Sequence, residues 1–567
     1  MKKILFLGTL LVLIHGLLGA ASAAEPKAVT TVSFDESSGS AFPVTFGLLF
    51  KKGDVPSGKS VAGRIGSSNI PIQVDQIATN SDGSYRYAIL SAIVPAGATT
   101  MDIVVSDSAL SGTPVLVGSD HGTTVTIDST TISPTQFIED WLSGPIVTEK
   151  VYVAFPTQHI TVFLNVRKYS NSDTRHEVVV ENSAWALKEG GFTTNYTYTI
   201  SIGDQTRDSG SLEHFHNTRW RELFWETGKE GIVKYTSGYL QSTKGILNYN
   251  PTRTVDEGTL AGYASTLTLS KFDKMGPGNY LIGMPTTGQA GQAHIGPIPQ
   301  WGVTYLMSMD NRARAITLAN SDVAGHIPWH FRYQQTMQPI RLADVADLVI
   351  NPSYESKGTL VAQASGSNGG WKLDTAHQPG HSFVSALVTG DRYYFEEMFF
   401  VVGWNGAWFV PNYRKDPVSN SADDGILQRQ TNRGQAWTLR TLSDAEYITA
   451  DDHFWKAELR RLLENNLNWY WKTFVESGTY TYGCCVDYAP LWPLGEAFRL
   501  GGKFPLLNSQ WQQDYLQSIH ALMADRGYPR AVELASWKGR AGSKFDIGNW
   551  CRYDADRYKL EVIDPET

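Results

Sequence analysis

Short apolar runs separated by Gly, Ser, Asn and Asp dominate the chain between residues 25 and 128. The clearest runs lie at 44–50, 70–74, 85–90 and 101–105. Regular short strands with turn residues between them are typical of a small β-sandwich. We therefore expect an N-terminal β-sandwich over 25–128, with the Thr- and Ser-rich stretch 122–133 as the join to the next unit.

Longer segments with alternating apolar and polar positions follow, at 159–169, 177–181 and 195–202. This alternation predicts strands of antiparallel sheets that bury one face. Because the β character continues for roughly 200 residues, we expect a large antiparallel β-sandwich over 129–345 rather than an immunoglobulin-sized one.

The apolar period changes to a helical one near residue 345. Leu459, Leu462, Leu463 and Leu467 fall at helical spacing, and the preceding Asp451 supplies a start signal. Further helices are predicted at 381–402, 429–443, 490–500, 509–526 and 529–538. Several helices joined by Gly/Pro loops predict helical hairpins packed around a shared centre over 346–567. The predicted fold class is therefore multidomain β + α.

The first 24 residues have the pattern of a secretory signal peptide. Lys2 and Lys3 precede an apolar run over 4–18, and Ala21-Ser-Ala23 resembles a cleavage site. No later segment reaches about 18 uninterrupted apolar residues, so we expect no stable membrane span. The sequence thus predicts a bacterial protein that is periplasmic or secreted.

Charge and cysteine content exclude several classes of function. The net charge is −8 and no basic stripe follows the signal, so we expect no nucleic-acid partner. Cys484, Cys485 and Cys551 are the only cysteines, which is too few for a disulfide scaffold or a cysteine metal site. One bridge from Cys484 or Cys485 to Cys551 is compatible with an oxidising compartment.

A loop around Pro379-Gly380 gathers chemically active side chains where a helical pattern begins. Asp374, His377, Gln378 and His381 surround this turn. Loops at helix starts can bring such groups together on a ligand. The alternative is that His377 and His381 only cap and pack the corner.

Two further clusters offer cations and aromatic platforms. Pro328-Trp329-His330-Phe-Arg332 combines a rigid turn with a stacking surface, a base and a cation, although a buried Trp with a capping His has the same pattern. Arg433, Trp437 and Arg440 share one helix face, so the arginines either pair with carboxylates or face an anionic ligand.

The sequence does not indicate a metal site. His214 and His216 would point to one face of a strand, but no third ligand is identifiable nearby. The chain also lacks a P-loop, a Rossmann fingerprint, a G-x-S-x-G elbow and an H-E-x-x-H motif. We predict no cofactor; a divalent cation is compatible with such a chain but is not indicated.

Short motifs between residues 40 and 445 resemble one family. They are Phe42-Pro-Val-Thr-Phe-Gly-Leu48, Pro71-Ile-Gln73-Val-Asp75, Asp82-Gly-Ser-Tyr-Arg-Tyr87, Val180-Glu-Asn182, Ile295-Gly-Pro297, Pro328-Trp-His330-Phe-Arg332, His377-Gln-Pro379 and Thr389-Gly-Asp391. With these motifs the chain resembles exported polysaccharide lyases that combine β-sandwiches with an (α/α) toroid, and the exo-rhamnogalacturonan lyase-like group most of all. The resemblance implies that 346–567 is a toroid-like helical domain.

The resemblance also implies β-elimination on an acidic polysaccharide that contains uronic acid. Such a reaction needs a cation beside the uronate carboxylate, a base for the C5 proton and an acid for the departing O4. Our candidate catalytic residues are His377, His330, Arg440 and Tyr394. Candidate substrate-binding residues are Arg332, Arg433, Trp329, Trp437, Gln378, Trp404 and Asn405.

Two other functions remain open at this point. A toroid can host a glycoside hydrolase, for which two of the carboxylates Asp374, Glu396, Glu397, Asp423 and Asp424 would have to face each other. A non-catalytic glycan-binding or cell-surface protein is the other alternative.

Overall fold

The structure is a computed structural model, and a subset of its residues is described. These residues are 28–35, 39–157, 159–183, 193–250, 253–269, 274–275, 295–333, 335–351, 359–360, 373–416, 424–427, 430–476, 506–508, 510–546 and 560–562. The predicted signal peptide, the three cysteines and the helix predicted at 490–500 lie outside them.

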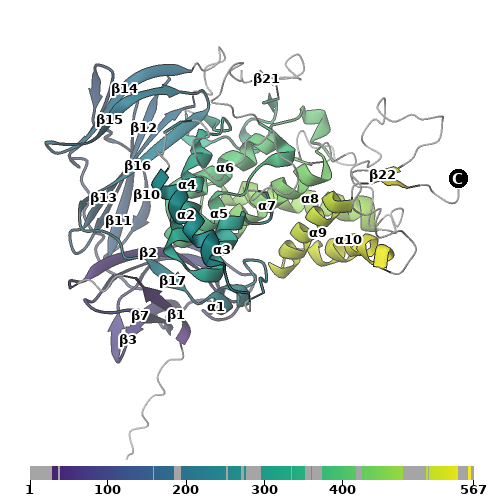
Figure 1. The fold of residues 1–567 in the computed structure, drawn as a ribbon, viewed down its shortest axis with the longest axis horizontal. Coiled ribbons are helices and arrows are strands. Elements are labelled where there is room, and N and C mark those ends of the chain that lie inside the picture. The colour runs from purple at the N-terminus through teal and green to yellow at the C-terminus, as the bar shows by residue number, and fades with distance from the viewer. Residues whose placement is uncertain are drawn as a thin grey trace, which may run out of the picture.

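Two antiparallel sheets form the N-terminal part (Figure 1). Sheet I has the strand order β17-β1-β7-β3-β4 and sheet II the order β2-β6-β5. Their strands are β1 (Ala28–Phe34), β2 (Phe42–Leu49), β3 (Ser60–Ile65), β4 (Ser68–Ile70), β5 (Gln73–Thr79), β6 (Tyr85–Val94), β7 (Thr100–Ser106) and β17 (Val233–Tyr235). The strands predicted at 44–50, 85–90 and 101–105 are confirmed. The run at 70–74 is divided between β4 and β5 at Pro71, which has no N–H for a strand ladder.

Two further antiparallel sheets follow. Sheet III has the order β10-β11-β12-β13-β16 and sheet IV the order β15-β14-β8-β9. Their strands are β8 (Thr123–Ile127), β9 (Thr130–Ile132), β10 (Gln136–Ser143), β11 (Val147–Ala154), β12 (Thr161–Tyr169), β13 (Thr174–Asn182), β14 (Thr194–Ile202), β15 (Gln205–His214) and β16 (Thr218–Thr227). The stretch 122–133 is therefore no join: β8 pairs with β14 and β9 with β8.

Sheet III has two buried faces, as the alternation along β12 shows. Val162 and Leu164 belong to a core shared with sheet IV, where Ile200 and Trp220 also pack. Phe163, between them in sequence, belongs to the larger core that includes the helices. Because strand side chains alternate between faces, sheet III lies between sheet IV and the helices.

The helices occupy the other half of the molecule (Figure 1). They are α1 (Ser237–Ser242), α2 (Glu257–Leu269), α3 (Gln300–Ser308), α4 (Asn311–Val323), α5 (Ser382–Thr389), α6 (Arg392–Gly406), α7 (Asn432–Ile448), α8 (Lys456–Tyr470), α9 (Gln510–Asp525) and α10 (Ala531–Asp546). Shorter elements are the 3₁₀ turns η1 (Ala324–His326), η2 (Leu342–Asp344), η4 (Thr375–His377) and η5 (Pro411–Tyr413), the π-helical turn η6 (Trp471–Glu476), and the strand pairs β18 (Arg332–Tyr333) with β19 (Gln338–Pro339), β20 (Leu348–Val349) with β21 (Thr359–Leu360), and β22 (Leu506–Asn508) with β23 (Leu560–Val562).

The prediction of continuous β structure up to residue 345 is wrong, because α1 to α4 lie between 237 and 323. Helix α2 contains several Gly, Ser and Thr residues, which have low helix propensity, and it packs against α4. Asp310 caps α4 by accepting a hydrogen bond from the Arg312 N–H at 2.8 Å. The tertiary packing of these helices thus overrides a weak local signal.

The helix predicted at 381–402 is interrupted. Gly390 adopts a left-handed conformation with φ of 67° and ends α5, and Asp391 then precedes α6. Glycine tolerates this conformation without steric cost. Because the helix is broken at this point, the Asp391 carboxylate can bind arginines of sheet III.

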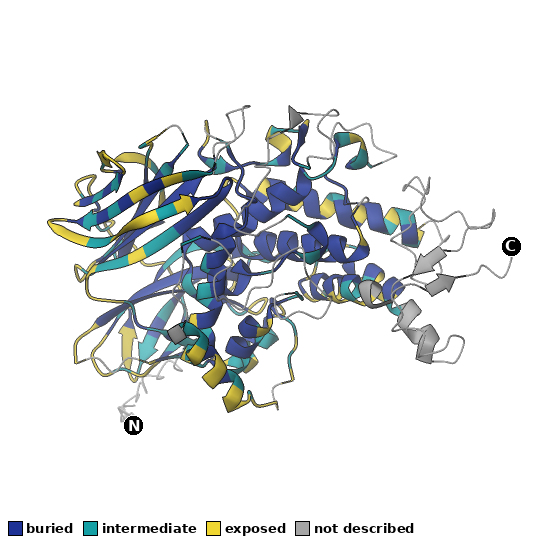
Figure 2. Cartoon of the chain, turned by 45° about the horizontal axis from the view of Figure 1, so that its top comes forward, coloured by how far each residue is buried: buried dark blue, intermediate teal, exposed yellow. Residues whose placement is uncertain are grey.

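Helices α6 and α7 are buried around their whole circumference. Every residue of both helices is buried, and Figure 2 shows them in dark blue at the centre of the molecule. A helix buried on all sides normally carries few charges. Both helices nevertheless carry several, and these charges must find partners inside the protein.

Across the described residues, none of the helices combines the length and apolar character that crossing a membrane requires.

Sheet II packs closely on α5, and Gly47 of β2 is the point of nearest approach. A Cβ atom built at Gly47 would lie 2.3 Å from the Leu387 carbonyl oxygen and 2.2 Å from the Tyr87 hydroxyl. The Tyr87 hydroxyl donates across the same contact to the Ala386 carbonyl at 3.2 Å, and the Tyr235 hydroxyl lies between the carbonyls of Gly47 at 2.8 Å and Val388 at 3.4 Å. The absence of a side chain at position 47 therefore allows the sheet to reach the helix.

We expect Gly47→Ala to lower the free energy of unfolding by about 3 kcal/mol, because the added methyl group overpacks a contact with backbone. Urea unfolding followed by circular dichroism measures this. Gly39→Ala is the control, since nothing lies within 4 Å of a Cβ built at Gly39. Equal stabilities of the two variants would contradict the prediction.

Candidate functional site

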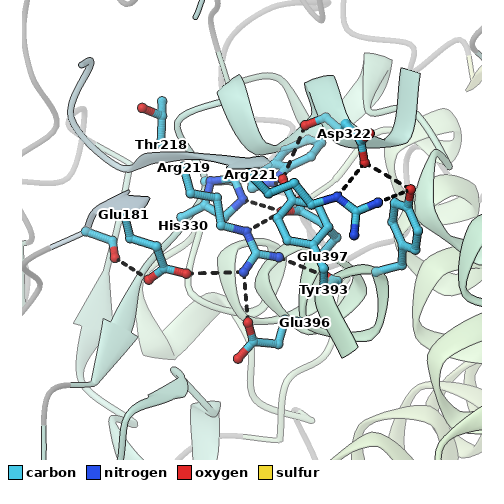
Figure 3. A network of polar contacts seen from close by, with 12 residues as sticks. Glu181, Thr218, Arg219, Arg221, Asp322, His330, Tyr393, Glu396 and Glu397 are labelled. Carbon is cyan, nitrogen blue, oxygen red and sulfur yellow. Dashed lines mark hydrogen bonds and ion pairs between the residues drawn. The ribbon is translucent and has the colours of Figure 1, made fainter. Parts of the chain in front are cut away.

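A buried network of arginines and carboxylates joins sheet III to α6, and Figure 3 shows its centre. Arg219 of β16 donates from Nε to Glu397 at 2.6 Å and from Nη1 to Glu396 at 2.8 Å and Glu181 at 3.1 Å. Its Nη2 donates to the Tyr393 carbonyl at 2.8 Å. One guanidinium thus binds three carboxylates from β13 and α6 and closes the gap between sheet and helix.

Arg332 lies beside Arg219 in the same network. It binds Glu181 through Nε at 2.7 Å and Nη2 at 2.7 Å, and Glu396 through Nη1 at 2.9 Å and Nη2 at 3.0 Å. The rings of Phe163 and Phe400 lie 4.5 and 5.0 Å from its Cζ atom. This guanidinium is fully engaged by protein groups.

His330 and Trp329 contact the same network through Glu397. His330 Nε2 lies 2.9 Å from Glu397 Oε1, and its Nδ1 lies 3.0 Å from the Asn217 carbonyl. Trp329 donates to Glu397 at 3.4 Å and packs on Trp404 with ring centroids 5.9 Å apart. Burial alone would raise the pKa of Glu397, but the His330 ring and the Arg219 guanidinium outweigh it and lower this pKa to about 2.

Tyr394 belongs to a second part of the network, around Asp391. Asp391 accepts from Arg175 at 2.8 Å and Arg167 at 2.9 Å. The Tyr394 hydroxyl accepts from Arg221 and donates to Asp322 at 2.9 Å. Burial, followed by the carboxylate of Asp322 acting against Arg221, holds the pKa of Tyr394 well above its usual range.

Gln378 and Asn405 form a buried amide pair at a different place. Gln378 Nε2 donates to the Asn405 side-chain oxygen at 3.0 Å, and Asn405 Nδ2 donates back to the Gln378 side-chain oxygen at 2.8 Å. Gln378 also donates to Thr438 Oγ1 at 3.0 Å and to the Thr375 carbonyl at 2.9 Å. These contacts tie the loop after η4 to α6 and α7.

Arg440 supports the same loop from α7. Its Nη2 donates to the Gln378 carbonyl at 3.1 Å and its Nη1 to the Gly296 carbonyl at 2.7 Å. No carboxylate lies within ion-pair distance of Arg440 in the described part of the chain. Burial lowers the pKa of this guanidinium to about 10, against the opposing effect of Asp444, so it stays charged at neutral pH.

Arg433 and Trp437 lie on α7 together with Arg440, as the spacing predicted. Trp437 is fully buried, 5.1 Å from the Arg440 Cζ atom and 4.8 Å from the Tyr515 ring. Arg433 lies on the first turn of α7, next to Gly434, where a Cβ would lie 3.3 Å from Thr375 Oγ1. The start of α7 therefore borders η4.

Asp374 and His377 form a dyad at the surface of this region. Asp374 accepts from the Ala376 N–H at 2.8 Å and thereby caps η4, and its other oxygen binds His377 Nδ1. The side chains of Asp374 and His377 are 29% and 13% exposed. By contrast, His381 is buried against Trp301, with stacked rings 5.9 Å apart. His377 is thus oriented by a carboxylate and accessible to solvent.

The predicted site residues therefore fall into three groups. Trp329, His330, Arg332 and Trp404 gather around Glu396 and Glu397, while Tyr394 lies with Asp391. A third group lies on η4, the loop after it, the end of α6 and α7, and consists of His377, Gln378, Asn405, Arg433, Trp437 and Arg440. A cavity of about 10 Å³ between Trp329, Glu397, Thr441 and Asp444 has room for about one water molecule and for no sugar.

Sequence reasoning missed the arginines that organise the network. Arg219 and Arg221 follow His214 and His216 closely in the sequence, but only the two histidines are considered in the sequence analysis, as possible metal ligands. His214 instead binds the Tyr196 hydroxyl at 2.8 Å and the Thr218 carbonyl at 3.1 Å, and burial lowers its pKa to about 3. In the described residues no group of three His, Cys, Asp or Glu side chains could hold a metal ion. The available signal was the pair Arg219 and Arg221 at alternating positions of one strand, together with Glu177 and Glu181 on one face of β13.

No model of a known protein family matches the chain, and no curated protein matches it significantly. The candidate site therefore depends on geometry. At the Asp374–His377 dyad, a titratable side chain is held in position by a carboxylate and is partly open to solvent.

The network predicts a loss of stability in acid. Unfolded Glu397 regains its ordinary pKa of 4.5, so the unfolded chain takes up this proton first as the pH falls. The contribution of Glu397, roughly 3 kcal/mol, is complete above about pH 4.5 and disappears toward pH 2. Urea unfolding between pH 7 and pH 3 measures the loss. A free energy of unfolding that stays constant over this range would contradict the prediction, and Glu397→Gln should show a smaller acid slope.

Proposed function

We propose that the protein is an exported carbohydrate-active enzyme, a polysaccharide lyase that cleaves a uronic-acid-containing polysaccharide by β-elimination. In this proposal the paired sheets are β-sandwiches and the helices an (α/α) toroid-like domain. The motif resemblance supports the reaction class. The observation that carries the proposal is the Asp374–His377 dyad, a half-buried base on a loop that buried contacts hold in place.

We assign the role of general base to His377. Asp374 binds Nδ1, which leaves Nε2 as the ring nitrogen that can take a proton from a substrate. An imidazole whose orientation is fixed by a carboxylate is a common general base in enzymes. Removal of the C5 proton leaves the electron pair that forms the C4–C5 double bond as the C4–O4 bond breaks. The resulting imidazolium is the proposed proton donor to the departing O4.

Gln378 and Arg440 act as positioning residues. The amide of Gln378 is fixed by Asn405 and Thr438, and its carbonyl is fixed by Arg440. Because proton transfer depends on geometry at the scale of 1 Å, a rigid loop next to the base contributes to rate. The charge of Arg440 below the loop also favours an anionic substrate. Arg433 at the start of α7 is buried as well, and its charge next to η4 would favour a uronate carboxylate in the same way.

The buried groups are assigned supporting roles. His330, Arg332 and Trp329 use their polar atoms within the protein, so we place them in the framework that positions α6. Tyr394 is buried between Arg221 and Asp322 and lies apart from the dyad. Trp404 and Trp437 are likewise packed in the core.

Two of the candidate carboxylates, Glu396 and Glu397, do not fit the proton-donor role in a glycoside hydrolase. A glycoside hydrolase needs a protonated carboxylic acid as proton donor near neutral pH. Arginines outweigh the effect of burial on Glu396 and lower its pKa, and the pKa of Glu397 is about 2. Both are therefore ionised in the folded protein. Asp423 lies outside the described residues.

The purified protein should convert uronate polysaccharides to products that absorb in the ultraviolet band of the C4–C5 double bond. We expect His377→Gln to lower kcat by roughly 10²–10⁴-fold, because the base is lost. Asp374→Asn should lower kcat less, because the His377 imidazole is still present and only the carboxylate that orients it is lost. His121→Gln is the control: His121 is a half-buried histidine that binds the Pro134 carbonyl at 2.7 Å, away from the dyad.

Three results would contradict this proposal. New reducing ends without ultraviolet absorbance would indicate hydrolysis. Binding of the polysaccharide without turnover would indicate a glycan-binding protein. Full activity of His377→Gln, with a circular dichroism spectrum like that of the wild type, would exclude His377 as the base.

A further inference from the structure

A cleft of about 780 Å³ lies between the N-terminal sheets and the C-terminal helices. Its walls come from distant segments: the β2–β3 loop with Lys51 and Lys52, the β5–β6 turn with Asn80 and Ser81, the end of α1, helices α7 and α8, and the α9–α10 connection. The volume is in the range of small-ligand sites. None of the predicted site residues lines this cleft.

The cleft carries more cations than carboxylates, although the chain has a net charge of −8. The cations are Lys51, Lys52, Lys244, Arg86, Arg460 and Arg526, and the carboxylates are Glu446, Asp451, Glu464 and Asp525. A local cation surplus in an acidic protein favours an anionic ligand.

The innermost carboxylates already have partners within the protein. Glu446 accepts from the Tyr528 hydroxyl and lies 3.1 Å from Lys456 Nζ. Asp451 accepts from the Thr79 N–H at 2.9 Å and the Thr79 hydroxyl at 2.6 Å. Glu446 also lies 3.5 Å from Arg86 and 3.6 Å from Arg460, Asp525 lies 4.0 Å from Lys244, and Asp444 lies 2.7 Å from Arg526. Among the cations of the cleft, Lys51 and Lys52 are therefore the two without an ion pair in the described part of the chain.

Two cations of the rim, Lys51 and Lys52, are far less engaged. Lys51 and Lys52 are exposed, and neither has an ion-pair partner among the residues that the structure describes. Lys52 Nζ donates only to Ser81 Oγ, at 3.3 Å. Both lysines line the cleft, and the Lys52 ammonium group lies beside the Ser81 hydroxyl.

The floor of the cleft adds two guanidinium groups packed on a buried tyrosine ring, and one of them has an unused donor. The Cζ atoms of Arg86 and Arg526 lie 4.7 and 4.9 Å from the centroid of the Tyr447 ring. Arg86 is 7% exposed, and its Nε has no hydrogen-bond partner among the described residues. A buried donor without a partner is costly, and a ligand or water in the cleft would relieve this cost.

The cleft is separate from the dyad. Gly434 borders η4 at the start of α7, whereas Glu446 and Tyr447 line the cleft at the other end. At 1.5 Å per residue, the two places are about 18 Å apart along α7. A chain bound in the cleft therefore does not occupy the position of His377.

We infer that this cleft is a second binding site, for an acidic oligosaccharide. Lys51 and Lys52 would bind a sugar carboxylate, while Asn80 and Ser81 would bind sugar hydroxyls. The choice of a sugar as the anion rests on the proposed function, whereas the anionic character rests on the cleft itself. Such a site would hold the polymer on the enzyme between turnovers.

Calorimetric titration of the His377→Gln protein with a trigalacturonate tests this inference, with the methyl-esterified trisaccharide as a neutral partner of the same length. We expect the acid to bind and the ester to bind far more weakly. Lys51→Gln with Lys52→Gln should weaken binding by about tenfold, since exposed ion pairs contribute up to about 1 kcal/mol each. Lys59→Gln is the matched control from the same loop, because Lys59 pairs with Asp107 at 2.8 Å outside the cleft.

The two proposals can fail separately. Binding that depends on Lys51 and Lys52 without any elimination by the wild type supports the cleft and overturns the lyase. Elimination by the wild type overturns the cleft site in two cases. One is an affinity that Lys51→Gln with Lys52→Gln leaves unchanged, and the other is an equal affinity for the acid and the ester. Should His377→Gln not fold, the same titration is made with the wild type at low temperature.

Discussion

The buried ion-pair network between sheet III and α6 is the constraint on which the rest of the structure depends. Taking an arginine and a carboxylate out of water costs several kcal/mol per ion, and only close, well-directed contacts offset this. Arg219 and Arg332 meet Glu181, Glu396 and Glu397 in such contacts. Few relative positions of sheet and helix satisfy all of them, so the network fixes where α6 lies.

The position of α6 is transmitted to the candidate site along the helix. Glu397 lies near its middle and Asn405 near its end, about 12 Å apart by the helical rise. Asn405 then holds Gln378, the residue after His377. Because α7 fixes the same loop through Thr438 and Arg440, the exposed dyad stands on a support that is buried and polar. The loop can thus be exposed at one residue and rigid at the next.

Local patterns predicted much of the secondary structure and some of the neighbourhoods. The alternation over 159–169 and 195–202 correctly predicted β12 and β14. The leucines between 459 and 467 correctly predicted α8. The same reasoning failed for α2, whose residues have low helix propensity, and for the break at Gly390, which depends on a backbone conformation. In the site, the spacing of Arg433, Trp437 and Arg440 correctly placed them on one helix.

The sequence by itself determined most of the strands, the helices α7 and α8 and the loop that contains His377, because these depend on neighbours along the chain. Only the tertiary structure decided that His330 and Arg332 are bound to Glu397 and Glu396, that Arg440 bonds to carbonyls, and that His377 keeps its exposed side. The partners lie tens to hundreds of residues apart. Burial and charge pairing are properties of the folded arrangement, and no short stretch of sequence contains them.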